Sequence, residues 1–207
     1  MPAGLYAVTP DEPDTRRLLA GVEAALAGGA RALQYRNKSA DANLRLTQGR
    51  ALLALCREYR RPLIINDHLD LALALGADGL HLGSEDGALP EAKARLGAGK
   101  ILGASCYDRL ENALEAQRAG ATYVAFGSFF PSSVKPGAVR APLSLLAAAR
   151  AELSLPVVAI GGITLDNAPR LIEAGAHGVA VISALFGAPD VRAAARDFSA
   201  LFGQCRP

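Results

Sequence analysis

Short apolar runs alternate with longer alanine- and leucine-rich segments along the whole chain. The apolar runs predict eight strands, over residues 5–8, 32–35, 63–65, 79–82, 101–104, 123–126, 157–160 and 178–182. The segments of helical period predict eight helices, over residues 15–27, 42–60, 69–75, 91–96, 110–119, 143–153, 165–174 and 191–202. This alternation is compatible with a closed (β/α)8 barrel or with an open doubly wound sheet.

The number of strand–helix units favours the closed barrel. An open dinucleotide-binding sheet would have Gly-x-Gly-x-x-Gly after its first strand, whereas Tyr6-Ala7-Val8-Thr9-Pro10 stands there. The 207 residues suffice for one sizeable core, and no linker rich in Ser, Pro or Gln divides them. We therefore predict one α/β domain over residues 1–207, a single TIM barrel.

Charge and hydropathy exclude two classes of partner. The formal net charge is +2 and the basic residues are scattered, which does not suggest nucleic-acid binding. No run of about 18 apolar residues predicts a membrane span. The first residues lack the basic start and apolar run of a signal peptide, so we expect a cytoplasmic protein that acts on small molecules. A homo-oligomer stays open.

Polar residues follow nearly every predicted strand. In a barrel these positions converge on one mouth at the carboxyl ends of the strands. In strand order they are Gln34, Arg36 and Lys38; Asn66, Asp67 and His68; His81, Ser84, Glu85 and Asp86; Ser105; Ser132, Ser133 and Lys135; Gly161 and Gly162; and Ser183. The sequence therefore predicts one composite site built from seven strand ends.

One side of this mouth is charged. Asp67 and Asp86 follow neighbouring strands, and two such carboxylates suit Mg²⁺, which completes its coordination with water and phosphate oxygens. Arg36 and Lys38 alternate along a strand end, so both can face a diphosphate. The alternatives are a helix cap and a turn for the two aspartates, and ordinary surface ion pairs for the two cations.

The other side is neutral and rich in backbone groups. Gly161-Gly162 and Ile182-Ser183 lie where barrels commonly bind a phosphate. The loop over residues 125–140 adds hydroxyls and one lysine, although by itself it could be a solvated turn. The three histidines have no metal-ligand spacing and are interpreted as packed or hydrogen-bonding residues. A diphosphate site beside a monophosphate site indicates an enzyme that joins two substrates.

A set of short motifs in a fixed order resembles the thiamine-phosphate synthase family over residues 5–186. The motifs are Gln34-Tyr35-Arg36-Asn37-Lys38, Asn66-Asp67, His81-Leu82-Gly83-Ser84-Glu85-Asp86, Gly103-Ala104-Ser105, the run from Gly127 to Lys135, Ile160-Gly161-Gly162-Ile163 and Val181-Ile182-Ser183-Ala184. The resemblance implies a compact (β/α)8 barrel. It also implies that the enzyme is a Mg²⁺-dependent transferase of thiamine biosynthesis, which joins hydroxymethylpyrimidine diphosphate to a thiazole phosphate or its carboxylated form.

The resemblance also implies roles for individual residues. Those that would hold the pyrimidine diphosphate are Gln34, Tyr35, Arg36, Asn37, Lys38, Asn66, Ser105 and Lys135, with Arg36, Lys38, Ser105 and Lys135 taking part in catalysis. Those that would hold the thiazole phosphate are Ser132, Ser133, Val134, Gly162, Ile182 and Ser183. Asp67 and Asp86 would bind Mg²⁺.

Two residues depart from the family pattern, and two other functions compete. Ser84 stands where the family usually has glutamine, and Val134 where its loop has a second threonine. A thiazole tautomerase of a related barrel family would have no diphosphate to neutralise. It would therefore not need Arg36, Lys38, Lys135 or the Asp67–Asp86 pair. A barrel that only senses thiamine phosphates would need few of the metal-binding groups.

Overall fold

The computed structural model describes residues 3–131, 137 and 139–204. Eight parallel strands form a closed barrel in which each strand pairs with its neighbours in the sequence and β8 pairs with β1. The strands are β1 Gly4–Val8, β2 Ala32–Tyr35, β3 Leu63–Asn66, β4 Gly79–Leu82, β5 Ile101–Tyr107, β6 Tyr123–Phe126, β7 Val157–Ile160 and β8 Gly178–Val181. The predicted (β/α)8 TIM barrel is confirmed, and the open sheet is excluded.

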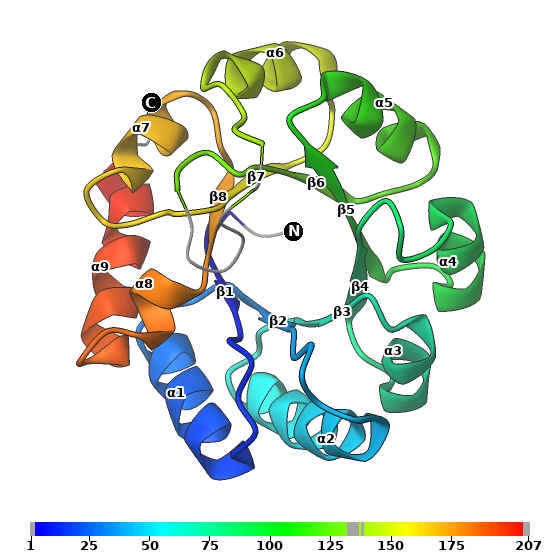
Figure 1. The fold of residues 1–207 in the computed structure, drawn as a ribbon, viewed down its shortest axis with the longest axis vertical. Helices are drawn as coiled ribbons and strands as arrows, with labels where there is room; N and C mark the ends of the chain where they lie inside the picture. The colour runs from blue at the N-terminus through cyan, green and yellow to red at the C-terminus, as the bar shows by residue number, and fades with distance from the viewer. Residues whose placement is uncertain (1–2, 132–136, 138, 205–207) are drawn as a thin grey trace.

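Helices form an outer ring around the strands (Figure 1). They are α1 Thr15–Ala27, α2 Ala42–Glu58, α3 Leu69–Leu75, α4 Leu89–Leu96, α5 Leu110–Arg118, α6 Ser144–Glu152, α7 Ala168–Glu173, α8 Ser183–Phe186 and α9 Val191–Gln204. The four-residue α8 was not predicted, because its residues were left in the loop after the strand predicted over residues 178–182. Among the helices that the structure describes, none is long and apolar enough to cross a membrane.

The barrel contains two apolar cores, separated by the wall of strands. The outer core joins the outward strand residues, such as Leu33, Ile65 and Val179, to the inner faces of the helices. The inner core fills the barrel with Tyr6, Val8, Ile64, Tyr123 and Val158 among others. Because successive strand residues point to opposite sides, each strand contributes to both cores and reads as one continuous apolar run.

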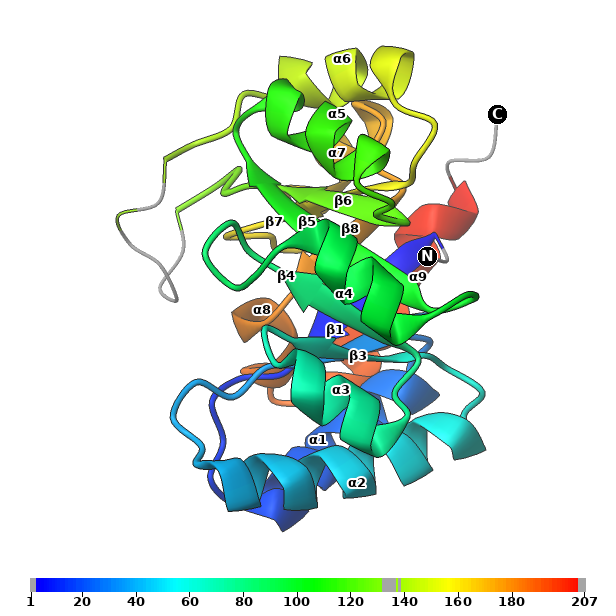
Figure 2. The same ribbon diagram turned by 90° about the vertical axis from the view of Figure 1, so that its right-hand side faces the viewer.

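The carboxyl ends of the strands form one face of the barrel. Figure 2 shows the ring from the side, with α8 directly after β8 on this face. Here β5 runs three residues beyond its predicted end, and its pairing with β6 shifts register between Ser105 and Tyr107. This bulge carries Tyr107 into a left-handed conformation, with φ 54°, and turns the chain over the mouth.

Candidate active site

A cavity of about 660 Å³ opens at the carboxyl ends of the strands. It brings together most of the predicted residues that the structure describes: Gln34, Arg36, Lys38, Asn66, Asp67, Asp86, Ser105, Gly162, Ile182 and Ser183. These residues come from six of the eight strand ends or the loops that follow them, if Asp86 is counted with β4. The predicted residues Ser132, Ser133, Val134 and Lys135 lie outside the described residues.

The side chains of Tyr35 and Asn37 do not line this cavity. The Tyr35 hydroxyl donates to Oε1 of Gln48 on α2 at 2.8 Å, and Nδ2 of Asn37 donates to the same oxygen at 3.1 Å. Asn37 and Nε2 of Gln48 also donate to the Glu12 carbonyl, each at 2.9 Å. Tyr35 and Asn37 thus fasten the β2–α2 loop to α2 and to the β1–α1 loop. Gln34, Arg36 and Lys38, which alternate with them, line the cavity.

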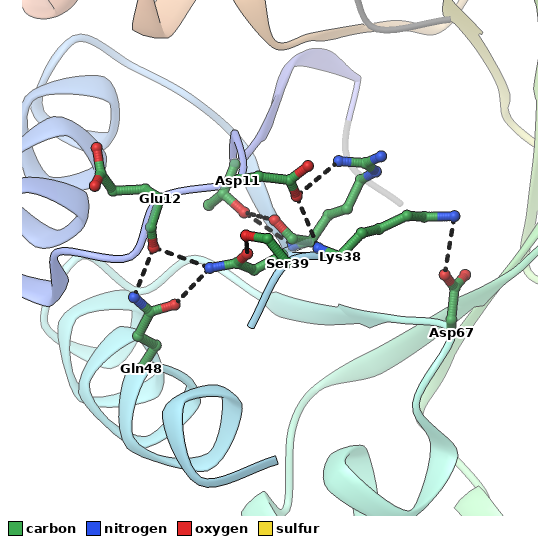
Figure 3. Close-up of polar contacts among 9 residues, drawn as sticks. Asp11, Glu12, Lys38, Ser39, Gln48 and Asp67 are labelled. Carbon is green, nitrogen blue, oxygen red and sulfur yellow. Dashed lines mark hydrogen bonds and ion pairs between the residues drawn. The ribbon is translucent and has the colours of Figure 1, made fainter. Parts of the chain in front are cut away.

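Asp11, which follows β1, holds the side chain of Arg36 and the backbone of Lys38. Its Oδ1 accepts from Nη1 of Arg36 at 3.1 Å and from the backbone N–H of Lys38 at 2.7 Å. The hydroxyl of Thr9 donates to the Arg36 carbonyl at 2.7 Å and accepts from the Arg36 N–H at 2.8 Å. Figure 3 shows Asp11 above this loop and the Lys38 side chain extending toward Asp67. The first loop therefore fixes the second before any ligand binds.

Asp67 and Asp86 face each other at the edge of the cavity. Asp67 has a left-handed backbone, with φ 63°, and its N–H donates to the His81 carbonyl at 2.9 Å. Burial, together with a hydrogen bond and repulsion from Asp86, raises the Asp67 pKa to about 6, against the opposing charge of Lys38 at 3.8 Å. Oδ2 of Asp86 accepts from the Gly83 N–H at 2.9 Å. The two carboxylates thus repel each other, and of the two only Asp67 is paired with Lys38 among the described contacts.

This pair fits a hard divalent cation. Mg²⁺ is commonly held by one or two carboxylates, with water and phosphate oxygens as its other ligands. The raised pKa of Asp67 is itself a sign of uncompensated negative charge that a cation would relieve. Among the described residues, no group of three or more His, Cys, Asp or Glu side chains is arranged to hold a metal.

Below the mouth, five polar side chains from five strands form a connected row, here called the interior network. Nε2 of Gln34 donates to the Tyr6 hydroxyl at 3.0 Å, and the Tyr6 and Tyr123 hydroxyls are 2.9 Å apart. The Tyr123 hydroxyl lies 2.8 Å from Nδ1 of His81, whose Nε2 lies 2.9 Å from Oγ of Ser105. Burial lowers the His81 pKa to about 4 and raises the pKa of both phenols, so all three are neutral at pH 7.

The neutral side of the mouth depends on glycine. Gly161 and Gly162 have φ of 101° and 63°, which residues with a Cβ rarely adopt. A Cβ on Gly161 would lie 2.0 Å from Oγ of Ser128, and one on Gly162 would lie 2.2 Å from the Pro131 carbonyl oxygen. The β7–α7 loop therefore packs directly on the backbone of the β6–α6 loop. Both glycines line the cavity, as do Ile182 and Ser183 after β8.

Comparison with known proteins agrees with this geometry. The model of the thiamine monophosphate synthase family matches residues 5–185. The chain is 58% identical to the thiamine-phosphate synthase of Thiobacillus denitrificans over 201 residues, which cover 97% of this chain and 95% of that protein. It is 59% identical to the thiamine-phosphate synthase of Methylobacillus flagellatus over 199 residues, which cover 96% and 95%. The chain belongs to the thiamine-phosphate synthase family.

A solved structure from this family has the same fold. Thiamine phosphate pyrophosphorylase from Pyrococcus furiosus is 39% identical, superposes with a TM-score of 0.86, and is matched over 98% of this chain and 96% of that one. A 3-hexulose-6-phosphate synthase superposes with a TM-score of 0.71 at 20% identity, which shows the shared barrel alone. The family inferred from the ordered motifs is thus confirmed.

The thiamine-phosphate synthase cavity of this chain also contains residues that were not predicted. Tyr107, Asp108, Arg109 and Asn112 line it from the β5–α5 segment, and Tyr6 lines it from within the barrel. Asp108 and Arg109 were missed because β5 was ended at residue 104. Asp11 was missed although it follows the first strand, and the rule that collects polar residues after strand ends would have found it.

Proposed function

We propose that this chain is a thiamine-phosphate synthase that joins hydroxymethylpyrimidine diphosphate to a thiazole phosphate, giving thiamine phosphate and diphosphate. The carboxylated thiazole substrate would also release CO₂. The observation that carries the proposal is the cavity itself, where Arg36, Lys38 and the Asp67–Asp86 pair lie opposite the neutral strand ends. The high identity to synthases over nearly the whole chain supports it.

The charged half of the mouth would bind the diphosphate substrate. Arg36 and Lys38 supply positive charge, and Asn66 supplies an amide at the cavity wall. Arg36 is well placed because Asp11 and Thr9 hold its side chain and its backbone. Charge that develops on a leaving diphosphate is stabilised best by groups that need not move. Lys135 would add a second ammonium, Gln34 and Ser105 would contact the pyrimidine, and Tyr35 and Asn37 would support the loop.

Asp67 and Asp86 would hold Mg²⁺ in this half. When bound, Mg²⁺ supplies a charge of +2 to the oxygens of the leaving diphosphate. The carboxylates would orient that charge, and Lys38, whose Nζ lies 3.8 Å from Oδ2 of Asp67, lines the same cavity. The C–O bond to diphosphate breaks, and the thiazole nitrogen donates its electron pair to the pyrimidine methylene carbon to form the new C–N bond.

The neutral half would bind the thiazole phosphate. Gly162, Ile182 and Ser183 line the cavity there, and backbone N–H groups of this kind bind phosphate without adding charge. Ser132, Ser133 and Val134 would complete the site. Two anionic groups held at opposite sides of one cavity would leave the reacting carbon and nitrogen between them. A bimolecular reaction then becomes effectively unimolecular.

The direct test is a product assay with purified protein. Incubation with both substrates and Mg²⁺ should give thiamine phosphate and diphosphate in equal amounts, and removal of Mg²⁺ with a chelator should abolish both. Absence of product at high enzyme concentration would refute the proposal. Incubation with the carboxylated thiazole phosphate alone tests the tautomerase alternative, for which we expect no conversion. We further propose that the enzyme acts in the cytoplasm as one domain over residues 1–207, either alone or as a homo-oligomer.

A further inference from the structure

The distances in the interior network do not say which group of each pair donates its hydrogen. We call the full set of these donor–acceptor directions the proton order. Each of its hydroxyls carries a single hydrogen, and a neutral imidazole carries one on either nitrogen. The network lies at the floor of the cavity, and its central groups are buried: Tyr6 is 2% exposed, Tyr123 is fully buried, and His81 is 6% exposed. Because buried polar groups must find partners within the network, the position of every proton follows from the first one.

Counting begins at Gln34, whose Nε2 can only donate. The Tyr6 oxygen accepts from it, so the Tyr6 hydrogen points to Tyr123. The Tyr123 oxygen accepts that hydrogen, so its own hydrogen points to Nδ1 of His81. Nδ1 is therefore an acceptor, and the single imidazole proton lies on Nε2, facing Ser105. With Nε2 of Gln34 facing Tyr6, only this order, with a neutral imidazole, satisfies every neighbour.

The end of the network opens into the cavity. Oγ of Ser105 accepts from His81, so the Ser105 hydrogen is left to point at whatever the cavity contains. We propose that Tyr123 and His81 are positioning residues that fix the Ser105 hydroxyl as a hydrogen-bond donor to the substrate. The substrate atom opposite Ser105 must then be an acceptor, such as a ring nitrogen with a lone pair or a phosphate oxygen.

The packing around Tyr123 keeps its ring in the position that this order requires. A Cβ on Gly103 would lie 2.1 Å from Cζ and 2.4 Å from Oη of Tyr123, so the ring lies directly across the β5 backbone. On its other sides the ring stacks on His81, with centroids 5.5 Å apart at 28°, and meets Tyr6 edge-on at 6.0 Å. The packing thus holds the ring with its hydroxyl oxygen beside Nδ1 of His81.

The opposite proton order needs a single change, rotation of the Gln34 amide so that Oε1 faces Tyr6. Each hydrogen would then point the other way, the imidazole proton would lie on Nδ1, and Ser105 would donate to His81 instead of to the cavity. The two orders therefore differ in the tautomer of one buried histidine, which ¹⁵N NMR reads directly on the intact protein without substrate. The His81 signals are those that disappear in His81→Gln.

The wild-type spectrum at pH 7 should show His81 protonated on Nε2 and not on Nδ1. Protonation on Nδ1 would overturn the proposal, and this outcome needs no variant to fold. The proton order does not depend on the proposed synthase activity, whereas its effect on turnover does. A protein without synthase activity would therefore fail the product assay while leaving the NMR result intact.

Two phenylalanine substitutions test the direction of the network. Tyr123→Phe removes the donor to Nδ1, so the His81 tautomer should become mixed and kcat/KM should fall about tenfold, the effect of one hydrogen bond. Tyr6→Phe leaves the Tyr123 hydrogen facing His81, so the tautomer should stay and kcat/KM should fall less than about threefold. Equal losses in both variants with an unchanged His81 tautomer would overturn the proposal.

A double substitution separates positioning from general loss of structure. If Tyr123 acts through Ser105, then Tyr123→Phe combined with Ser105→Ala should be no slower than Ser105→Ala alone. Independent losses that multiply in the double variant would overturn the proposal. Melting temperatures of all variants are measured in parallel, so that rates are compared only among folded proteins.

Discussion

The Nζ atom of Lys38 lies 3.8 Å from Oδ2 of Asp67, and the same aspartate faces Asp86. One lysine is thus shared between a carboxylate pair and the side of the cavity where a diphosphate would bind. Lys38 lowers the pKa of Asp67, while burial and Asp86 raise it by more. Lys38 and a metal ion would therefore compete for the negative charge of Asp67, although both would attract the diphosphate substrate.

This competition predicts opposite effects of Lys38→Gln on two ligands. Without the ammonium, Mg²⁺ alone should bind about threefold more tightly, since an exposed pair contributes less than about 1 kcal/mol. Inorganic diphosphate in the presence of saturating Mg²⁺ should bind at least about tenfold more weakly, because a charge-assisted hydrogen bond is lost. Isothermal titration calorimetry measures both constants.

Lys93→Gln is the matched control, because Lys93 belongs to α4 and does not line the cavity. Neither constant should change in that variant. A loss of affinity for both ligands in Lys38→Gln would contradict competition between Lys38 and the metal.

Asp67→Asn should stabilise the protein at neutral pH in the presence of a chelator. The folded pKa of about 6 lies above the ordinary 3.8, so the folded state favours the protonated form. Ionisation therefore costs stability above about pH 6, and this cost diminishes as the pH falls toward 3.8. Asparagine also accepts the left-handed backbone of this position. After allowance for solvent screening, we expect a gain of about 1 kcal/mol at pH 8.

Thermal unfolding at pH 8 and pH 4.5 measures this gain, which should be smaller at the lower pH. Added Mg²⁺ should reverse the order of the two proteins, because it stabilises only the one that binds it. Asp70→Asn is the control, since the side chain of Asp70 is 88% exposed and should give no gain. A destabilised Asp67→Asn protein at pH 8 without metal would show that burial of this carboxylate carries no cost.

The order of strands and the location of the candidate site could be predicted from the sequence, because both follow from the spacing of apolar residues along the chain. Apolar runs separated by helical segments leave few closed arrangements, and strand ends in a barrel share one face. The same period of two that places Arg36 and Lys38 on one side places Tyr35 and Asn37 on the other. The assignment of the whole segment to substrate binding followed the motif and did not separate its two faces.

Other features depended on contacts between distant residues and could not be predicted. Tyr6 and Tyr123 read as apolar strand residues, and their hydroxyls meet only because β1 and β6 face each other inside the closed barrel. The extension of β5 to Tyr107 depends on a register shift against β6. A local pattern contains neither of these relationships, since both are properties of strand pairing.

Gln48→Leu should lower the stability of the fold. The Gln48 side chain is fully buried on α2 and accepts from Tyr35 and Asn37 while donating to the Glu12 carbonyl. Leucine has similar volume but leaves the Tyr35 hydroxyl without a partner and removes one of the two hydrogen bonds at Asn37 and at the Glu12 carbonyl, which should cost about 2–3 kcal/mol. Thermal unfolding should show a melting temperature lower by about 4–12 °C.

Gln117→Leu serves as a matched amide deletion, because Gln117 accepts from Ser154 near the surface, where water can replace it. It should cost no more than about 1 kcal/mol. Since the loop fastened by Gln48 carries Arg36 and Lys38, Gln48→Leu should also raise KM for the diphosphate substrate. Equal stability of the two variants would mean that the buried amide is not needed to hold the loop.

Gly162→Ala should weaken binding of the thiazole phosphate through a steric clash, and a second glycine variant separates this clash from backbone strain. Gly162 and Gly76 have nearly the same left-handed φ, 63° and 62°, so alanine at either position costs about 1–2 kcal/mol of backbone strain. A Cβ at Gly76 meets nothing within 4 Å, whereas one at Gly162 would lie 2.2 Å from the Pro131 carbonyl oxygen.

Both variants should lose stability, but only Gly162→Ala should push the β6–α6 loop away from the cavity. Steady-state kinetics should then show KM for the thiazole phosphate raised at least about tenfold, the effect of one lost charge-assisted hydrogen bond, with Gly76→Ala unchanged. If the two variants had the same KM, the contact between the two loops would not shape the phosphate site.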